Sequence, residues 1–145
     1  MVHTVPVVVD RVPADARQIA EPLLVPRPDG PTPRDAIGDL PGIGWNPVDD
    51  DRHRVNHWLT CITVDPETGT TPEQLRLALE GADIESRPVW KPMHLQPVFA
   101  GARAVLDGTS DRLFATGLCL PSGGAMTGTE QDRIVEIVRK HWGSS

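Results

Sequence analysis

The sequence predicts an α+β fold, in which a small sheet of short strands carries helices packed on one face. Two amphipathic segments, each opened by a threonine capping box, predict helices. Short apolar runs bounded by turn residues predict strands between them. Along the chain the order is strand, helix, strand, loop, helix, strand, helix, after an irregular proline-rich amino-terminal arm.

The chain divides by composition into an arm and a domain. Its 145 residues suffice for one domain with a core, and nine of the fifteen prolines lie in the first fifty residues. We therefore expect a proline-rich arm at residues 1–40 and a folded domain at 41–145. Within the arm, residues 5–9 are apolar enough for one short strand. Residues 21–35 favour extended chain, as a linker rather than as a ligand for a proline-binding domain.

The first elements of the domain have clear boundaries. An apolar run at about residues 57–64 predicts a largely buried strand. In the helix that follows, Thr71 is the N-cap, Gln74 completes the capping box, and Gly81 marks the end. A second short strand is predicted at residues 84–89.

The carboxy-terminal elements follow a long loop. A short helix is expected over residues 108–117, packing Leu113 and Phe114. The run LCLP, residues 118–121, predicts a third strand, closed by an SGG turn. The last helix opens with a capping box in the motif TGTE and carries apolar residues at helical spacing.

Composition excludes several classes of protein. A net charge of −6 provides no basic surface for nucleic acid or for an anionic membrane. No apolar run approaches the ~20 residues of a membrane span, and residues 5–9 are too short for a signal sequence. We expect a cytoplasmic protein, in which Cys61 and Cys119, flanked by aliphatic residues, are buried free thiols.

No metal site is predicted. His53, His57 and Cys61 recur every fourth residue, which would align three ligands on a helix. This segment is predicted as a loop followed by a strand, so the spacing does not gather them. The aspartates at residues 49–51 lack the glycine and glutamate of a calcium loop.

No catalytic residue is predicted either. Ser122 lies in LPSGG, which lacks the G-x-S-x-G nucleophile elbow, and no phosphate-binding glycine motif is present. Neither Lys91 nor Lys140 stands among groups that would lower its pKa for covalent catalysis. The residues alone thus give no complete catalytic arrangement.

The loop RPVWKPMHLQPVF, Arg87 to Phe99, is the most unusual segment. Its prolines Pro88, Pro92 and Pro97 forbid a continuous helix and predict a rigid, extended loop. A rigid loop loses little entropy when it binds a ligand, which suits a segment rich in polar side chains.

Three motifs, NHWLT, this loop and LCLPSG, occur in order within about residues 40–142. In these motifs the sequence closely resembles the carboxy-terminal small domain of the DegT/DnrJ/StrS sugar aminotransferases. Members of this family are pyridoxal phosphate enzymes of fold type I. They transfer an amino group, usually from glutamate, to a keto nucleotide-sugar.

The resemblance places the proline-rich loop at the edge of an active site. His94 and Lys91 would then bind anionic or hydroxyl groups of a nucleotide-sugar. An alternative interpretation of the aromatic residues Trp58, Trp90 and Phe99 is that they belong to the core. The substrate-binding residues that the resemblance implies are Asn56, Arg87, Trp90, Lys91, His94 and Gln96.

The resemblance also implies what this stretch of sequence lacks. In the family, the lysine that forms the aldimine and the aspartate that pairs with the pyridine nitrogen belong to the large domain. We therefore expect that this chain alone neither binds pyridoxal phosphate nor transaminates. Its expected partners are a large-domain chain or a second copy of itself.

Two alternatives stay open at this point. The chain is either a truncated or split aminotransferase domain, or a non-catalytic accessory module that binds a nucleotide-sugar or an aminotransferase subunit. A small enzyme with His94 as general base is disfavoured, because the sequence shows no partner to orient the imidazole. An isolated small domain should also expose an apolar patch where the large domain normally packs.

Overall fold

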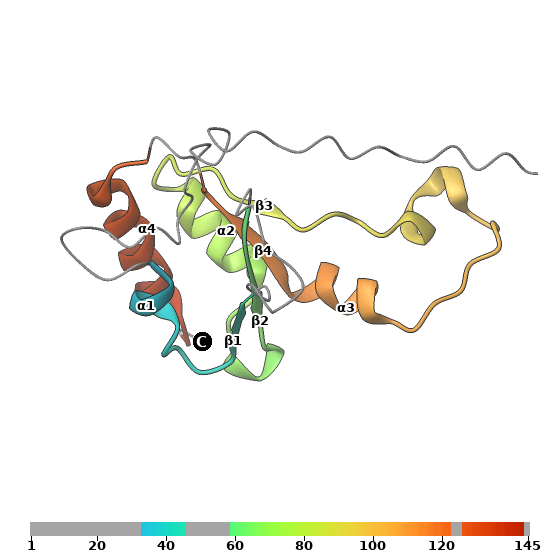
Figure 1. Cartoon of the computed structure of the whole chain (residues 1–145), viewed down its shortest axis with the longest axis horizontal. Helices are drawn as coiled ribbons and strands as arrows, with labels where there is room; N and C mark the ends of the chain where they lie inside the picture. The colour runs from blue at the N-terminus through green and yellow to red at the C-terminus, as the bar shows by residue number, and fades with distance from the viewer. Residues whose placement is uncertain (1–32, 46–58, 123–125, 144–145) are drawn as a thin grey trace, which may run out of the picture.

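A computed structural model describes residues 33–45, 59–122 and 126–143 of the chain (Figure 1). A four-stranded antiparallel sheet lies beside a group of helices. The strands are β1 (Ile43–Trp45), β2 (Thr60–Val64), β3 (Arg87–Pro88) and β4 (Gly117–Leu120). The helices are α1 (Pro33–Ile37), α2 (Pro72–Glu80), α3 (Thr109–Thr116) and α4 (Gly128–His141). Three short 3₁₀ turns are Pro66–Thr68, Met93–Leu95 and Pro97–Phe99.

The sheet is built around the pair β2 and β4. Its strand order is β1-β2-β4-β3, so the two central strands come from distant parts of the chain. Ile62 lies opposite Leu118, and Cys61 opposite Cys119. On the far side of β4, Arg87 of β3 is also opposite Cys119.

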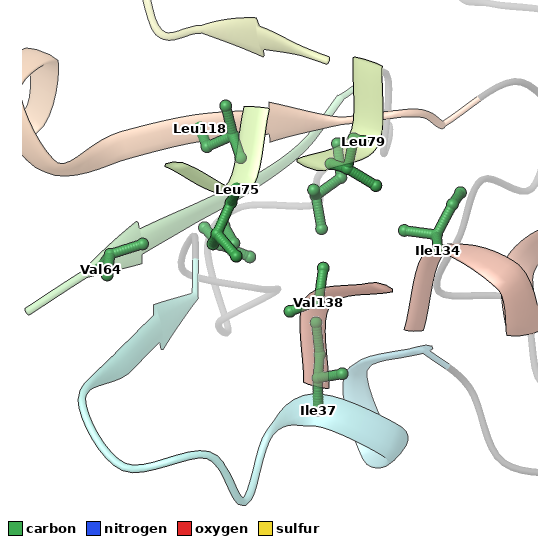
Figure 2. Close-up of a cluster of buried hydrophobic side chains, with 9 residues drawn as sticks. Ile37, Val64, Leu75, Leu79, Leu118, Ile134 and Val138 are labelled. Carbon is green, nitrogen blue, oxygen red and sulfur yellow. The ribbon is translucent and has the colours of Figure 1, made fainter. Parts of the chain in front are cut away.

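The core lies on one face of this sheet. It combines alternate residues of β2 and β4 with residues from α1, α2 and α4, which cover that face (Figure 2). The buried side chains are Ile37, Ile62, Val64, Leu75, Leu79, Leu118, Leu120, Ile134 and Val138. The predicted α+β fold, with a small sheet and helices on one face, is confirmed.

Both predicted capping boxes are present. In α2 the backbone N–H of Thr71 donates to Gln74 Oε1 at 2.8 Å, and the backbone N–H of Gln74 donates to Thr71 Oγ1 at 3.2 Å. In α4 the same exchange joins Thr127 and Glu130, at 2.7 and 3.3 Å. These local bonds satisfy amides that the first turn of a helix leaves unpaired.

Two strands differ from their predictions. The strand expected over residues 84–89 is reduced to Arg87–Pro88. The amide of Ile84 donates instead to Leu79 O at 3.0 Å, closing the end of α2, and Pro88 has no N–H to extend the pairing. The strand β1 was not predicted, because the prolines and glycines of LPGIGWNP, residues 40–47, indicate a turn-rich approach to the domain. Here Gly44 lies against the Thr63 side chain, and any Cβ would clash with it.

The helix α3 also differs in its packing. Its bounds, between Gly108 and Gly117, agree with the prediction. It buries no residue, however, and Leu113, which was expected to pack, is 46% exposed. The helix lies beside the sheet away from the main core, where Phe114 is half-buried.

Residues before position 40 contribute to the core. Ile37 of α1 is 0% exposed, although it precedes the boundary predicted at residue 40. Arg139 of α4 holds this segment by donating from Nε to Ala36 O at 2.7 Å and from Nη2 to Asp39 Oδ1 at 2.6 Å. The division into arm and domain stays a prediction. The strand at residues 5–9 and the SGG glycines lie outside the described residues.

Replacing Ile37 by Ala tests whether α1 belongs to the folded unit. We expect the free energy of unfolding to fall by about 2–4 kcal/mol, because a buried side chain leaves a cavity. Leu77→Ala, at an exposed position of α2, should change it by less than about 0.5 kcal/mol. Urea denaturation of both variants measures this, and equal, small effects would show that α1 is not docked.

Candidate functional site

The proline-rich loop projects away from the sheet. Residues 89–108, here called the projecting segment, leave β3 in extended form and return to α3 (Figure 1). The prediction of an entirely extended loop is wrong, because the middle forms two consecutive 3₁₀ turns. Pro92 caps the first turn and Pro97 occupies the first position of the second, where a missing N–H costs nothing. The predicted absence of a continuous helix is confirmed.

A groove of about 760 Å³ opens where the projecting segment leaves the sheet. Its lining comes from residues 85–91, from Leu59 and from Phe114 of α3. The end of β4 and the two residues that follow it, together residues 119–122, complete the lining. Three of the predicted site residues, Arg87, Trp90 and Lys91, therefore border one space. This groove is the candidate site.

Cationic and aromatic groups stand at its rim. Arg87 donates from Nε to Glu85 Oε1 at 2.6 Å, and both side chains are exposed. Lys91 is exposed beside them. Trp90 is 67% exposed, so the alternative that it is a core residue is wrong. Phe99 is half-buried, while Trp58 and Asn56 lie outside the described residues.

His94 and Gln96 do not line the groove but support the projecting segment. His94 Nε2 lies 2.8 Å from Asp111 Oδ1 at the start of α3, and the His94 side chain is only 18% exposed. The expectation that no partner orients His94 is therefore wrong. Gln96 Nε2 donates to Lys91 O at 3.1 Å, which ties the first 3₁₀ turn to the extended part.

Sequence reasoning missed Asp111 and Glu85 as parts of this region, and it placed Ser122 only in a turn after the last strand. Asp111 lies seventeen positions from His94. No spacing rule links residues so far apart, because only the fold brings α3 to the projecting segment. The sequence offered one signal for Asp111, namely its position as a carboxylate in the first turn of a predicted helix.

The described residues assemble no metal site: they contain no group of three or more His, Cys, Asp or Glu side chains placed to hold an ion.

Cys119 does not provide a reactive thiolate. Burial, and then the neighbouring Cys61 thiol, raise the pKa of Cys119 to about 12. This thiol is therefore protonated at neutral pH.

The described residues do not fit pyridoxal phosphate. The cofactor requires an enclosed lysine and a carboxylate or arginine partner for its ring nitrogen. Lys91 is exposed at the rim of the groove, and Lys140 is exposed in the last turn of α4.

Each helix among the described residues is too short or too polar to span a membrane.

Known structures with a similar fold are parts of aminotransferases. The fold is similar to Helicobacter pylori PseC, an aminotransferase of pseudoaminic acid biosynthesis, with a TM-score of 0.66, 16% identity, and coverage of 78% of this chain and 30% of that one. It is also similar to DesI, solved in the presence of its TDP-sugar product, with a TM-score of 0.62, 28% identity, and coverage of 74% and 28%.

The chain belongs to the DegT/DnrJ/EryC1/StrS aminotransferase family, whose model matches residues 32–139. It is 37% identical over 109 residues to EpsN of Bacillus subtilis (strain 168), whose name describes a pyridoxal phosphate-dependent aminotransferase. It is 30% identical over 78 residues to the GDP-perosamine synthase of Caulobacter vibrioides. The matches cover 72% and 54% of this chain, but only 27% and 21% of those relatives. The resemblance noted from sequence motifs is confirmed.

The contact between His94 and Asp111 has a measurable role. Asp111→Ala should release the projecting segment and speed tryptic cleavage after exposed Arg103 several-fold, because alanine cannot accept from His94 Nε2 and the contact to α3 is lost. Global stability should change by less than about 1 kcal/mol, since the pair is partly exposed.

The matched control is Asp107→Asn. It removes the same charge nearby, and an asparagine side chain still accepts from the Thr109 amide, which Asp107 Oδ1 does at 2.9 Å. Cleavage rates that are equal in the two variants would show that Asp111 does not hold the segment.

Proposed function

We propose that this chain is the small domain of a pyridoxal phosphate-dependent nucleotide-sugar aminotransferase and does not transaminate alone. The observation that carries the proposal is the family match over residues 32–139, combined with coverage of only about a quarter of the relatives' length. The lysine and pyridine-binding carboxylate of the active site would come from a large domain outside the matched region. This domain would complete the site at the groove.

The groove suits the diphosphate and sugar parts of such a substrate. Lys91 and Arg87 place cationic groups at its rim, and an exposed indole, Trp90, offers a flat face for a ring. In this proposal, Arg87, Trp90 and Lys91 contact substrate, whereas His94 and Gln96 hold the segment that carries them. Asn56 remains a proposed substrate-binding residue on family likeness alone.

Exposed apolar side chains support a partner at the projecting segment. Among the described residues, most of the large apolar side chains that are exposed lie in this one segment. They are Trp90, Met93, Leu95, Val98, Val105 and Leu106. Scattered apolar residues are normal on surfaces, but such a concentration is typical of an interface. We propose that the large domain, or a second copy of this chain, covers them.

Cofactor binding tests the proposal directly. We expect the purified chain with pyridoxal phosphate to show no aldimine band between about 330 and 450 nm, and to carry no covalently attached cofactor after borohydride reduction. The reason is that neither lysine is enclosed. Covalent attachment after reduction that is lost in Lys91→Ala and kept in Lys140→Ala would mean that Lys91 forms the aldimine, and the proposal would fail.

Surface exposure gives a second test. The wild-type chain should bind an apolar fluorescent dye or self-associate in light scattering, because the projecting segment is uncovered. The double variant Met93→Ser and Val98→Ser should lose most of that signal, whereas Leu77→Ser on α2 should keep it. A monomer that binds no dye would contradict an interface at this segment.

A further inference from the structure

The face of the sheet opposite the core carries two cysteines side by side. Along β2, Thr60, Ile62 and Val64 are buried on the core face, so Cys61 points to the other face. The antiparallel register places Cys119 of β4 directly opposite. Their Sγ atoms are 3.5 Å apart, and both thiols are free.

This geometry suits a disulfide. Opposed residues in antiparallel strands have Cα atoms about 4.5–5.5 Å apart, within the range of about 4.4–6.8 Å that disulfides need. A bond therefore requires side-chain rotation rather than movement of the strands. Because the two cysteines are 58 positions apart, the bond would close a long loop.

The two thiols differ in access. Cys61 is half-buried, whereas Cys119 is 6% exposed, so a small oxidant meets Cys61 first. Burial keeps the Cys119 thiol protonated, so Cys119 is a poor nucleophile toward an external reagent. It is already in contact with Cys61, however, and needs no diffusion to resolve an adduct formed there.

We propose that Cys61 and Cys119 are a reversible redox pair that a low-molecular-weight disulfide converts to a cross-strand disulfide. First, the Cys61 thiolate attacks one sulfur of the small disulfide, and one thiolate leaves. Next, Cys119 loses its proton and attacks Cys61 Sγ, and the second thiolate leaves. The cysteine pair loses two electrons and two protons, and one small disulfide becomes two thiols.

The site matters because Cys119 also lines the groove and lies opposite Arg87. Oxidation would thus fix β2 to β4 within the wall of the candidate site. The inference rests on the register and the sulfur contact, and it holds whether or not the chain acts as an aminotransferase domain.

The test is oxidation of the folded, reduced full chain with excess oxidised glutathione at pH 8, followed by intact mass measurement. We expect a monomer lighter by two hydrogen atoms, with a melting temperature higher by at least about 5 °C and restored by dithiothreitol. A persistent glutathione adduct, an intermolecular dimer, or no reaction in the wild type would overturn the proposal.

Two variants separate the steps. Cys119→Ala should stop at a stable glutathione adduct on Cys61, and Cys61→Ala should not react while folded. Rapid reaction of Cys61→Ala would overturn the assigned order of attack. If either variant fails to fold, phenylarsine oxide, which bridges adjacent thiols, supplies a second measurement on the wild type. It should block both cysteines with one arsenic atom, and separate or absent labelling would refute the pair.

Discussion

The pairing of β2 with β4 is the interaction on which the rest of the molecule depends. Alternate residues of each strand point to opposite faces, so this one register decides what each face contains. On one face Ile62 and Leu118 join the core, and on the other Cys61 meets Cys119. A shift by one residue would place thiols in the core and aliphatic side chains in solvent.

The candidate site follows from where this sheet stops. Pairing between β3 and β4 lasts only from Arg87 to Pro88, because Ile84 closes the preceding helix and the proline cannot continue the ladder. The chain is thus released toward solvent at the edge of the groove. Contact with α3 through His94 then limits how far this released chain can move.

Local patterns in the sequence predicted local structure well. Both capping boxes form between residues three positions apart, so the sequence contains all the information they need. The strand β1 and the contact of His94 with Asp111 depend on the fold instead. Gly44 has a low strand propensity, and only its pairing with β2 places it against Thr63, where a larger residue would clash. Likewise, only the packing of α3 brings Asp111 within hydrogen-bonding distance of His94. The residues that the resemblance implied fall into two groups: Arg87, Trp90 and Lys91 line the groove, whereas His94 and Gln96 lie in the projecting segment. Only the fold reveals this division.

The distance along the chain between the two central strands has a consequence for synthesis on the ribosome. Cys119 is made 58 residues after Cys61, which at ribosomal speed is a delay of roughly 3–12 s. During that time β2 has no β4 to pair with, while the capping box of α2 can already form. The nascent chain can pair β2 with β1, which is made earlier, but the edge of β2 that β4 will cover stays unpaired for seconds.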